Sequence, residues 1–211
     1  MKTESSPVFL QVENLQKSFG GVRALKGLSF KVPPGIIKAI IGPNGAGKTT
    51  LFNVITGIFP PNGGAIALNG QSIEGCEARE IARLGVSRTF QNVEVFGRMT
   101  VLENVMVGRH IQSRAGIIST GFRLLGMRRE ERQIRESAMQ HLAFVGLENR
   151  TTELAGNLPL GEQKLLEVAR ALATDPKILL LDEPAGGLNT RETEGLAALI
   201  HRILEQKITV V

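Results

Sequence analysis

The chain is poor in cysteine and in large aromatic residues: its 211 residues contain no tryptophan, no tyrosine and one cysteine, Cys76. A single cysteine excludes an internal disulfide framework and is typical of a protein from a reducing compartment. No apolar run reaches the roughly 18 residues that a membrane-spanning helix needs. The first residues, MKTESSPVFLQ, lack the long apolar stretch of a secretory signal, so we do not expect export.

The remaining composition is ordinary for a globular protein, with 42% hydrophobic and 21% charged residues and a formal net charge of +5. A positive charge suits nucleic acid or an anionic membrane surface. The lysines and arginines are spread along the chain, however, which favours a solvated basic surface. The length allows one full domain with room for an inserted subdomain.

Short strands and helices alternate in the predicted secondary structure, with one helical interruption. Residues 91–166 form that interruption, with amphipathic helices expected at 100–110 and 128–147. This order is typical of an α/β sheet with a helical insertion. Outside the insertion we expect strands at 8–14, 27–32, 37–42, 64–70, 86–90, 177–183 and 208–211, and helices at 48–58, 77–85 and 191–206.

The segment GPNGAGKTT, residues 42–50, matches the phosphate-binding pattern G-x-x-x-x-G-K-[ST] between a predicted strand and a predicted helix. Its glycines allow consecutive N–H groups to curl around an anion, and the helix directs its positive end to the same place. We expect Lys48 to reach the β- and γ-phosphates of a bound nucleotide and the Thr49 hydroxyl to bind Mg²⁺. The candidate nucleotide-binding residues here are Gly42, Pro43, Asn44, Gly45, Ala46, Gly47, Lys48, Thr49 and Thr50.

Two acids, Asp182 and Glu183, directly follow the apolar residues 178–181. Ligands of open α/β sheets bind beyond the carboxyl ends of the strands, so we expect both acids at the nucleotide site. Asp182 is expected to hold Mg²⁺ through water, and Glu183 to activate the attacking water as a general base. Such a strand end is unremarkable alone, but beside residues 42–50 it indicates a site for nucleotide hydrolysis.

These two motifs resemble the Walker A and Walker B motifs of the ATP-binding subunits of ABC transporters. Residues 81–110 and 187–200 are similar, in particular, to those of branched-chain amino acid importers. The resemblance implies a P-loop NTPase core of α/β class, with an N-terminal antiparallel β subdomain and an inserted helical subdomain. We assign residues 1–90 with 167–211 to the core and residues 91–166 to the helical subdomain.

The resemblance also assigns a role to Gln91, which stands where the family has a glutamine that senses Mg²⁺ and the attacking water. The expected catalytic residues are therefore Lys48, Gln91 and Glu183. The expected metal-binding residues are Thr49, Gln91 and Asp182.

Three further segments receive roles from the resemblance. Phe19 occupies the place of the aromatic residue that stacks on adenine, with a plain core position as the alternative. Residues 185–189, AGGLN, match the D-loop that crosses to the partner subunit, with Asn189 in place of the usual aspartate. Residues 111–128 fit an extended segment of the branched-chain group, and we expect a loop packed on its own subunit rather than a membrane-seeking stretch.

Residues 158–172, LPLGEQKLLEVARAL, correspond to the family's L-S-G-G-Q signature when ARAL is the anchor. In the family this signature grips the γ-phosphate of ATP held by the opposite subunit. Pro159 replaces the serine, as is familiar in the branched-chain group, Leu160 the first glycine and Glu162 the glutamine, while Gly161 keeps the second glycine. A helix N-terminus tolerates proline and still offers N–H groups to an anion, but Glu162 would repel a nearby phosphate unless it turned away. We expect a weakened but usable clamp, and a tighter ATP-dependent pairing of subunits for Glu162→Gln.

One expected residue is absent: the family has a switch histidine just beyond the strand at which this chain stops. The histidines present are His110, His141 and His201, and none lies there. We therefore expect a truncated form that lacks the C-terminal part, binds ATP and hydrolyses it poorly.

The resemblance further implies partners and a location. We expect a second ATP-binding subunit, identical or a sister chain, integral-membrane permease subunits and, indirectly, a periplasmic or extracellular substrate-binding protein. The chain would be cytoplasmic and peripheral on the inner face of the cell membrane. A soluble ABC ATPase acting on nucleic acid or ribosomes is a rival interpretation. The long coiled coils of DNA-repair members and the second cassette of translation-type members do not fit in 211 residues, so no nucleic acid is expected. Urea, lipid and lipopolysaccharide remain alternative cargoes to hydrophobic amino acids. A regulatory subunit without turnover is disfavoured because the motif residues are intact.

Overall fold

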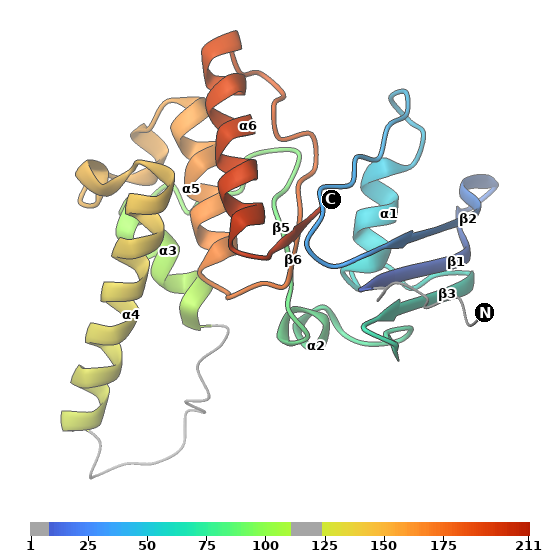
Figure 1. Ribbon diagram of the computed structural model, residues 1–211, viewed down its shortest axis with the longest axis horizontal. Coiled ribbons are helices and arrows are strands. Elements are labelled where there is room, and N and C mark those ends of the chain that lie inside the picture. Colours follow the sequence, from blue (N-terminus) through green and yellow to red (C-terminus); the bar gives the residue numbers. More distant parts are fainter. Residues whose placement is uncertain (1–8, 111–123) are drawn as a thin grey trace, which may run out of the picture. The chain divides into compact units, whose positions relative to one another are not determined.

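The computed structural model describes residues 9–110 and 124–211, which fall into two compact units (Figure 1). Unit 1 contains the residues up to Arg88 together with Lys177–Asp182 and Ile200–Val211. Unit 2 contains Thr89–Pro176 and Glu183–Leu199. The assignment of residues 91–166 to a separate helical subdomain stays a prediction. The expected segment 111–128 lies mostly outside the described residues.

An antiparallel sheet forms the N-terminal part of unit 1, as predicted. Its strands are β1 (Leu10–Phe19), β2 (Val22–Val32), β3 (Gly63–Leu68) and β4 (Gln71–Ser72), in the order β2-β1-β3-β4. The apolar residues of β1 share one buried face because Leu10 and Val12 alternate with polar neighbours. An irregularity in the pairing between Val12 and Leu15 brings Leu15 back to that face after a three-residue step.

A parallel sheet forms the second layer of strands in unit 1. It consists of β5 (Val86–Arg88), β6 (Ile178–Leu180) and β7 (Thr209–Val210), in the order β5-β6-β7. All three residues of β6 are buried, as expected for an apolar strand covered on both faces. The predicted strands at 86–90, 177–183 and 208–211 are confirmed with shorter bounds. Asp182 and Glu183 therefore follow the carboxyl end of the central strand.

The predicted strand at 37–42 is wrong as a regular strand. Ile37 makes one isolated parallel bridge to Val210, and the N–H of Lys38 donates to the Val210 carbonyl at 2.9 Å. The side chains alternate as in a strand: Ile36 and Ile40 pack on the core of unit 1, whereas Ile41 is 94% exposed. The partial burial of Ile36 and Ile40 and the exposure of Ile41 agree with the alternation expected of a strand. The apolar pattern does not show whether a neighbouring strand is available for hydrogen bonding. Within the described residues no such strand pairing continues beyond Lys38, so no regular strand is formed.

Helix α1 (Lys48–Ile55) packs its apolar side against the core of unit 1 (Figure 1). It is shorter than the predicted 48–58 because Gly57 has a φ of +73°, which ends the helical turn. Helix α2 (Ala78–Arg83) begins with a reciprocal cap between Glu77 and Glu80. The buried apolar side chains of α1 are Leu51, Phe52, Val54 and Ile55.

Unit 2 is built around α3 (Val101–His110), α4 (Leu124–Val145) and α5 (Leu160–Leu172), which pack against one another (Figure 1). The predicted apolar face of α4, residues Ile134, Ala138, Leu142 and Val145, is buried. Two short 3₁₀ turns, Glu148–Arg150 and Ala155–Asn157, connect α4 to α5. Helix α6 (Thr190–Glu205) starts in unit 2 and ends in unit 1. Within the described residues no helix is both long and apolar enough to cross a membrane.

Candidate nucleotide site

The predicted phosphate loop of unit 1 leads directly into α1. Gly47 caps this helix with a φ of +92° and has no side chain to bond the first N–H groups. A Cβ atom at Gly47 would lie 2.6 Å from the carbonyl oxygen of Ala24 in β2, so only glycine fits without a shift of the backbone. The loop thus leads into the positive end of a helix through a position that requires glycine.

Lys48 lies against this loop. Its Nζ donates to the carbonyl of Gly42 at 2.9 Å and to that of Pro43 at 3.2 Å. The residues between, from Pro43 to Ala46, are exposed to solvent. A positive charge is therefore held at the rim of a loop whose shape suits a polyphosphate.

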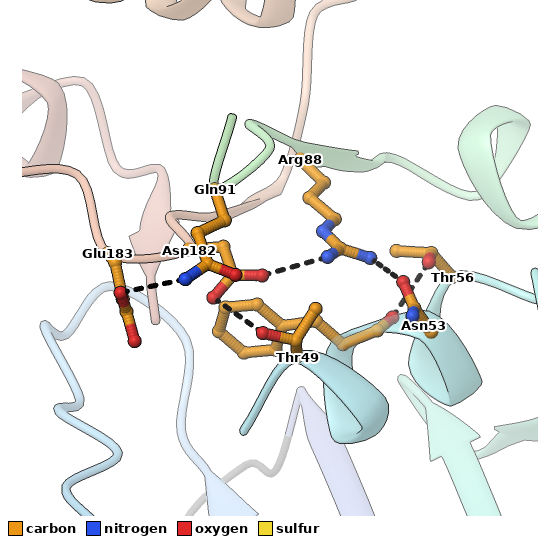
Figure 2. A network of polar contacts seen from close by, with 8 residues as sticks. Thr49, Asn53, Thr56, Arg88, Gln91, Asp182 and Glu183 are labelled. Atoms are coloured by element: carbon orange, nitrogen blue, oxygen red, sulfur yellow. Dashed lines mark hydrogen bonds and ion pairs between the residues drawn. The ribbon is translucent and has the colours of Figure 1, made fainter. Parts of the chain in front are cut away.

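The Thr49 hydroxyl, one residue further, faces Asp182. Its Oγ1 donates to Asp182 Oδ1 across 3.4 Å, which is long for such a bond (Figure 2). Asp182 is 2% exposed, so its carboxylate needs a compensating charge. Arg88 supplies it, with Nη2 2.9 Å from Asp182 Oδ2. Burial lowers the pKa of Arg88, and the neighbouring Asp182 opposes that shift. The predicted metal-binding pair Thr49 and Asp182 is thus brought together.

Phe19 lies at the end of β1 and is 43% exposed, so it is not the core residue of the alternative interpretation. Its ring meets Phe59 edge to face with 5.3 Å between the centroids. The buried Lys17 places its Nζ 5.1 Å from the centroid of Phe19. Both neighbours hold the ring while part of it stays open to solvent, a geometry that suits stacking on a base.

Gln91 and Glu183 meet in unit 2, where the Nε2 of Gln91 donates to Glu183 Oε2 at 3.0 Å (Figure 2). Glu183 has a φ of +48°, an uncommon conformation for a residue with a side chain. Lys164 of α5 supports this turn: its Nζ donates to the carbonyl of Pro184 at 3.0 Å and lies 3.4 Å from that of Glu183. Sequence analysis missed Lys164, and its only signal was a charge on the apolar side of α5.

The signature segment forms the start of α5, with Pro159 as the capping residue and Leu160 as the first helical residue. Glu162 turns to Arg150, with Oε1 3.4 Å from Nη2. The same Arg150 contacts both carboxylate oxygens of Glu153, and these two acids raise the pKa of Arg150. The negative charge of Glu162 is therefore partly compensated within its own unit.

Gly161 lies against the start of α6. A Cβ atom at Gly161 would lie 2.6 Å from Glu192 Oε1. Glu192 and Asn189 cap α6 reciprocally: each backbone N–H donates to the other side chain at 2.9 Å. This cap gives Asn189 a structural role at the position where the family has aspartate.

The ion pair between Glu162 and Arg150 predicts that neutralising either residue changes the strength of ATP-dependent subunit pairing, in opposite directions for the two residues. In a Glu183→Gln background that blocks hydrolysis, Glu162→Gln is expected to tighten ATP-dependent subunit pairing by no more than about fivefold, because partly exposed ion pairs are weak. Arg150→Gln is expected to weaken pairing, because it leaves Glu162 uncompensated. The double variant should pair like Glu162→Gln, because Arg150 then has no Glu162 charge to compensate. Light scattering against ATP concentration measures this, and equal pairing for all four proteins would place Glu162 away from any phosphate.

The polar groups of this site fit ATP and Mg²⁺. The phosphate loop and Lys48 match a polyphosphate, and the Thr49 hydroxyl with the Asp182 carboxylate supplies the oxygen ligands that Mg²⁺ prefers. Nowhere in the described ranges do three or more His, Cys, Asp or Glu residues gather as a metal cage of their own. Mg²⁺ bound together with a nucleotide is commonly held by one or two protein groups and by the phosphates.

A family model described as ABC transporter matches residues 25–186. The chain is 44% identical to the high-affinity branched-chain amino acid transport ATP-binding protein BraF of Pseudomonas aeruginosa, over 98% of this chain and 81% of that protein. It is 42% identical to LivG of Escherichia coli, a protein with the same description, over the same shares of the two chains.

Solved structures agree with these relatives. A nucleotide-free ATP-binding cassette from an ABC transporter is 33% identical and superimposes with a TM-score of 0.78, over 96% of this chain and 79% of that one. The ADP conformation of an ATP-binding cassette is 32% identical with a TM-score of 0.79, over the same shares. The expected P-loop NTPase fold is thereby confirmed, and the chain belongs to the ABC transporter family.

Proposed function

We propose that this chain is the ATP-binding and ATP-hydrolysing subunit of an ABC importer for branched-chain or other hydrophobic amino acids. The observation that best supports ATP hydrolysis is the contact between Thr49, which follows the phosphate loop, and Asp182, which follows the end of strand β6. The cargo rests on the 44% and 42% identity to BraF and LivG.

Each residue of the site has one task in this proposal. Lys48 and the N–H groups at the start of α1 bind the β- and γ-phosphates. Thr49 and Asp182 hold Mg²⁺, which neutralises negative charge on the phosphates when it is bound. Phe19 stacks on the base.

Glu183 takes a proton from the attacking water, and Gln91 orients the Glu183 carboxylate through its hydrogen bond at 3.0 Å. Pro159, Leu160, Gly161 and Glu162 lie at the start of α5, where backbone N–H groups are available to a phosphate of a second subunit.

The proposed partners are a second ATP-binding subunit and two integral-membrane permease subunits, which place the chain on the inner face of the cell membrane. An ATP-binding subunit has no cargo pocket of its own in this arrangement. The permeases and a substrate-binding protein select the amino acid, and the paired ATP-binding subunits move the permeases when ATP joins them.

Reconstitution with the membrane partners tests the proposal. The chain, co-purified with its permeases in proteoliposomes containing ATP, is expected to accumulate labelled leucine when the substrate-binding protein is added. Hydrolysis without uptake of leucine, isoleucine or valine, but with uptake of urea, would replace the cargo and keep the ATPase. Absence of ATP binding by the purified chain would contradict the whole proposal.

A further inference from the structure

Arg88 joins two elements of unit 1 at the proposed Mg²⁺ site. It is the last residue of β5, and its Nη2 lies 2.9 Å from Asp182 Oδ2. Its Nη1 donates to Asn53 Oδ1 in α1 (Figure 2). The guanidinium carbon lies 5.7 Å from the centroid of Phe52, also in α1. One side chain thus connects the helix after the phosphate loop to the acid at the end of β6.

The two oxygens of Asp182 have different partners. Oδ1 accepts from the Thr49 hydroxyl at 3.4 Å, and Oδ2 accepts from Arg88. Thr49 and Asn53 are four residues apart in α1 and so lie on the same side of the helix. Arg88 therefore binds the Asp182 oxygen that points away from Thr49 and leaves the other oxygen facing it.

This arrangement resists reorientation. The side chains of Arg88 and Asp182 are 5% and 2% exposed, so water cannot easily replace either partner. Rotation of the Asp182 carboxylate would separate a buried ion pair. The fork of the guanidinium is also anchored at Asn53, which a single ammonium group could not reproduce.

We propose that Arg88 is a positioning residue for the Mg²⁺ site: by binding Asp182 Oδ2 and Asn53 together, it keeps Asp182 Oδ1 directed to Thr49 for the metal. The inference rests on the proposed function, because Asp182 and Thr49 are metal-binding only if the chain binds Mg²⁺ with ATP. Partners of this kind orient metal ligands, and their loss costs roughly 10- to 100-fold in metal affinity.

The test measures how much Mg²⁺ improves ATP binding. The Kd of a fluorescent ATP analogue is determined with EDTA and with Mg²⁺, and the ratio of the two is the Mg²⁺ gain. Arg88→Gln is expected to lower the gain by about tenfold or more while the Kd in EDTA stays within about twofold. Arg88→Lys keeps the charge but not the fork, and is expected to recover only part of the gain. A merely structural role would weaken binding equally in both buffers.

Two single variants and one double variant serve as controls, and Asn53→Ala is a second test. Arg83→Gln removes an exposed arginine from the end of α2 and should keep the full gain. Asp182→Asn should abolish the gain, and adding Arg88→Gln to it should change nothing further. Asn53→Ala removes the second anchor without leaving a buried charge alone, so it is informative even if Arg88→Gln does not fold. It is expected to lower the gain several-fold, less than Arg88→Gln.

The outcomes separate this inference from the proposed function. If the unaltered chain binds no ATP, or binds it without a Mg²⁺ gain, the proposed function fails. If the unaltered chain shows the gain and folded Arg88→Gln or Asn53→Ala keeps it, the inference alone is overturned. Full recovery by Arg88→Lys would also overturn it, since charge rather than position would then suffice.

Discussion

Replacing Glu183 with glutamine is expected to slow ATP hydrolysis by about 10²- to 10⁴-fold, the usual contribution of a general base, while ATP still binds. Glutamine has the size of glutamate, so the turn at residue 183, with its φ of +48°, stays supported by Lys164. The amide can still accept a hydrogen bond from Gln91. Only the ability to accept a proton from water is removed.

Single-turnover hydrolysis with protein in excess over ATP measures this effect, because it detects slow chemistry without a need for product release. Glu194→Gln is the matched control: it neutralises an exposed glutamate in α6, outside the site, and should hydrolyse ATP like the unaltered chain. Because binding continues without hydrolysis, ATP-dependent subunit pairs should accumulate and be visible in light scattering. Hydrolysis within about threefold of the unaltered chain would exclude Glu183 as the general base, since a general base contributes far more than that.

The site residues that the sequence predicted are those whose roles depend on local spacing. The pattern from Gly42 to Thr50 requires a loop that leads into a helix, and the backbone of Gly47 follows from that requirement. The apolar residues before Asp182 likewise predicted a buried strand with an acid at its end. In both cases neighbours in sequence are also the neighbours in structure that matter.

The residues that were missed act through pairs distant in sequence. Arg88 and Asp182 are 94 positions apart, and Lys164 and Pro184 are 20 positions apart. Arg88 is the last residue of the short strand β5, and from the sequence alone a charge in that place indicates a solvated strand end. Only the parallel pairing of β5 with β6, which sets Arg88 beside Leu180, brings it to Asp182. Such pairing depends on tertiary packing. The strand predicted at residues 37–42 was wrong for the same reason, because the sequence does not show which strand would pair with it.

The unusual residues Glu162, in the signature segment, and Asn189, in the D-loop segment, were also explained only by contacts that the sequence does not show. From the sequence, Glu162 was a charge expected to repel phosphate unless it turned away. The structure supplies Arg150, which precedes α5, as its partner. Asn189, taken from sequence as a departure from the D-loop pattern, caps α6 together with Glu192. Each substitution is thus accommodated by a polar contact that a residue-by-residue comparison with the family pattern does not contain.

Replacing Lys48 with alanine is expected to weaken ATP binding by about 10- to 150-fold, the range that corresponds to a hydrogen bond to a charged group. The Nζ of Lys48 lies at the carbonyls of Gly42 and Pro43, so it is held at the mouth of the phosphate loop. An alanine there keeps α1 intact, because alanine is a strong helix former. The loss should therefore come from the missing positive charge rather than from unfolding of the helix.

Comparing nucleotides with different numbers of phosphates tests whether the loss comes from the missing positive charge of Lys48. Lys48 is expected to contact the β- and γ-phosphates, so Lys48→Ala should weaken ATP and ADP binding and leave the much weaker binding of AMP unchanged. Lys31→Ala, which removes an exposed lysine from β2, is the control for the loss of one positive charge and should bind all three nucleotides normally. Titration calorimetry or displacement of a fluorescent nucleotide gives the three affinities. An equal loss for AMP would mean that Lys48 acts by shaping the loop, since AMP has no β- or γ-phosphate for its ammonium group to meet.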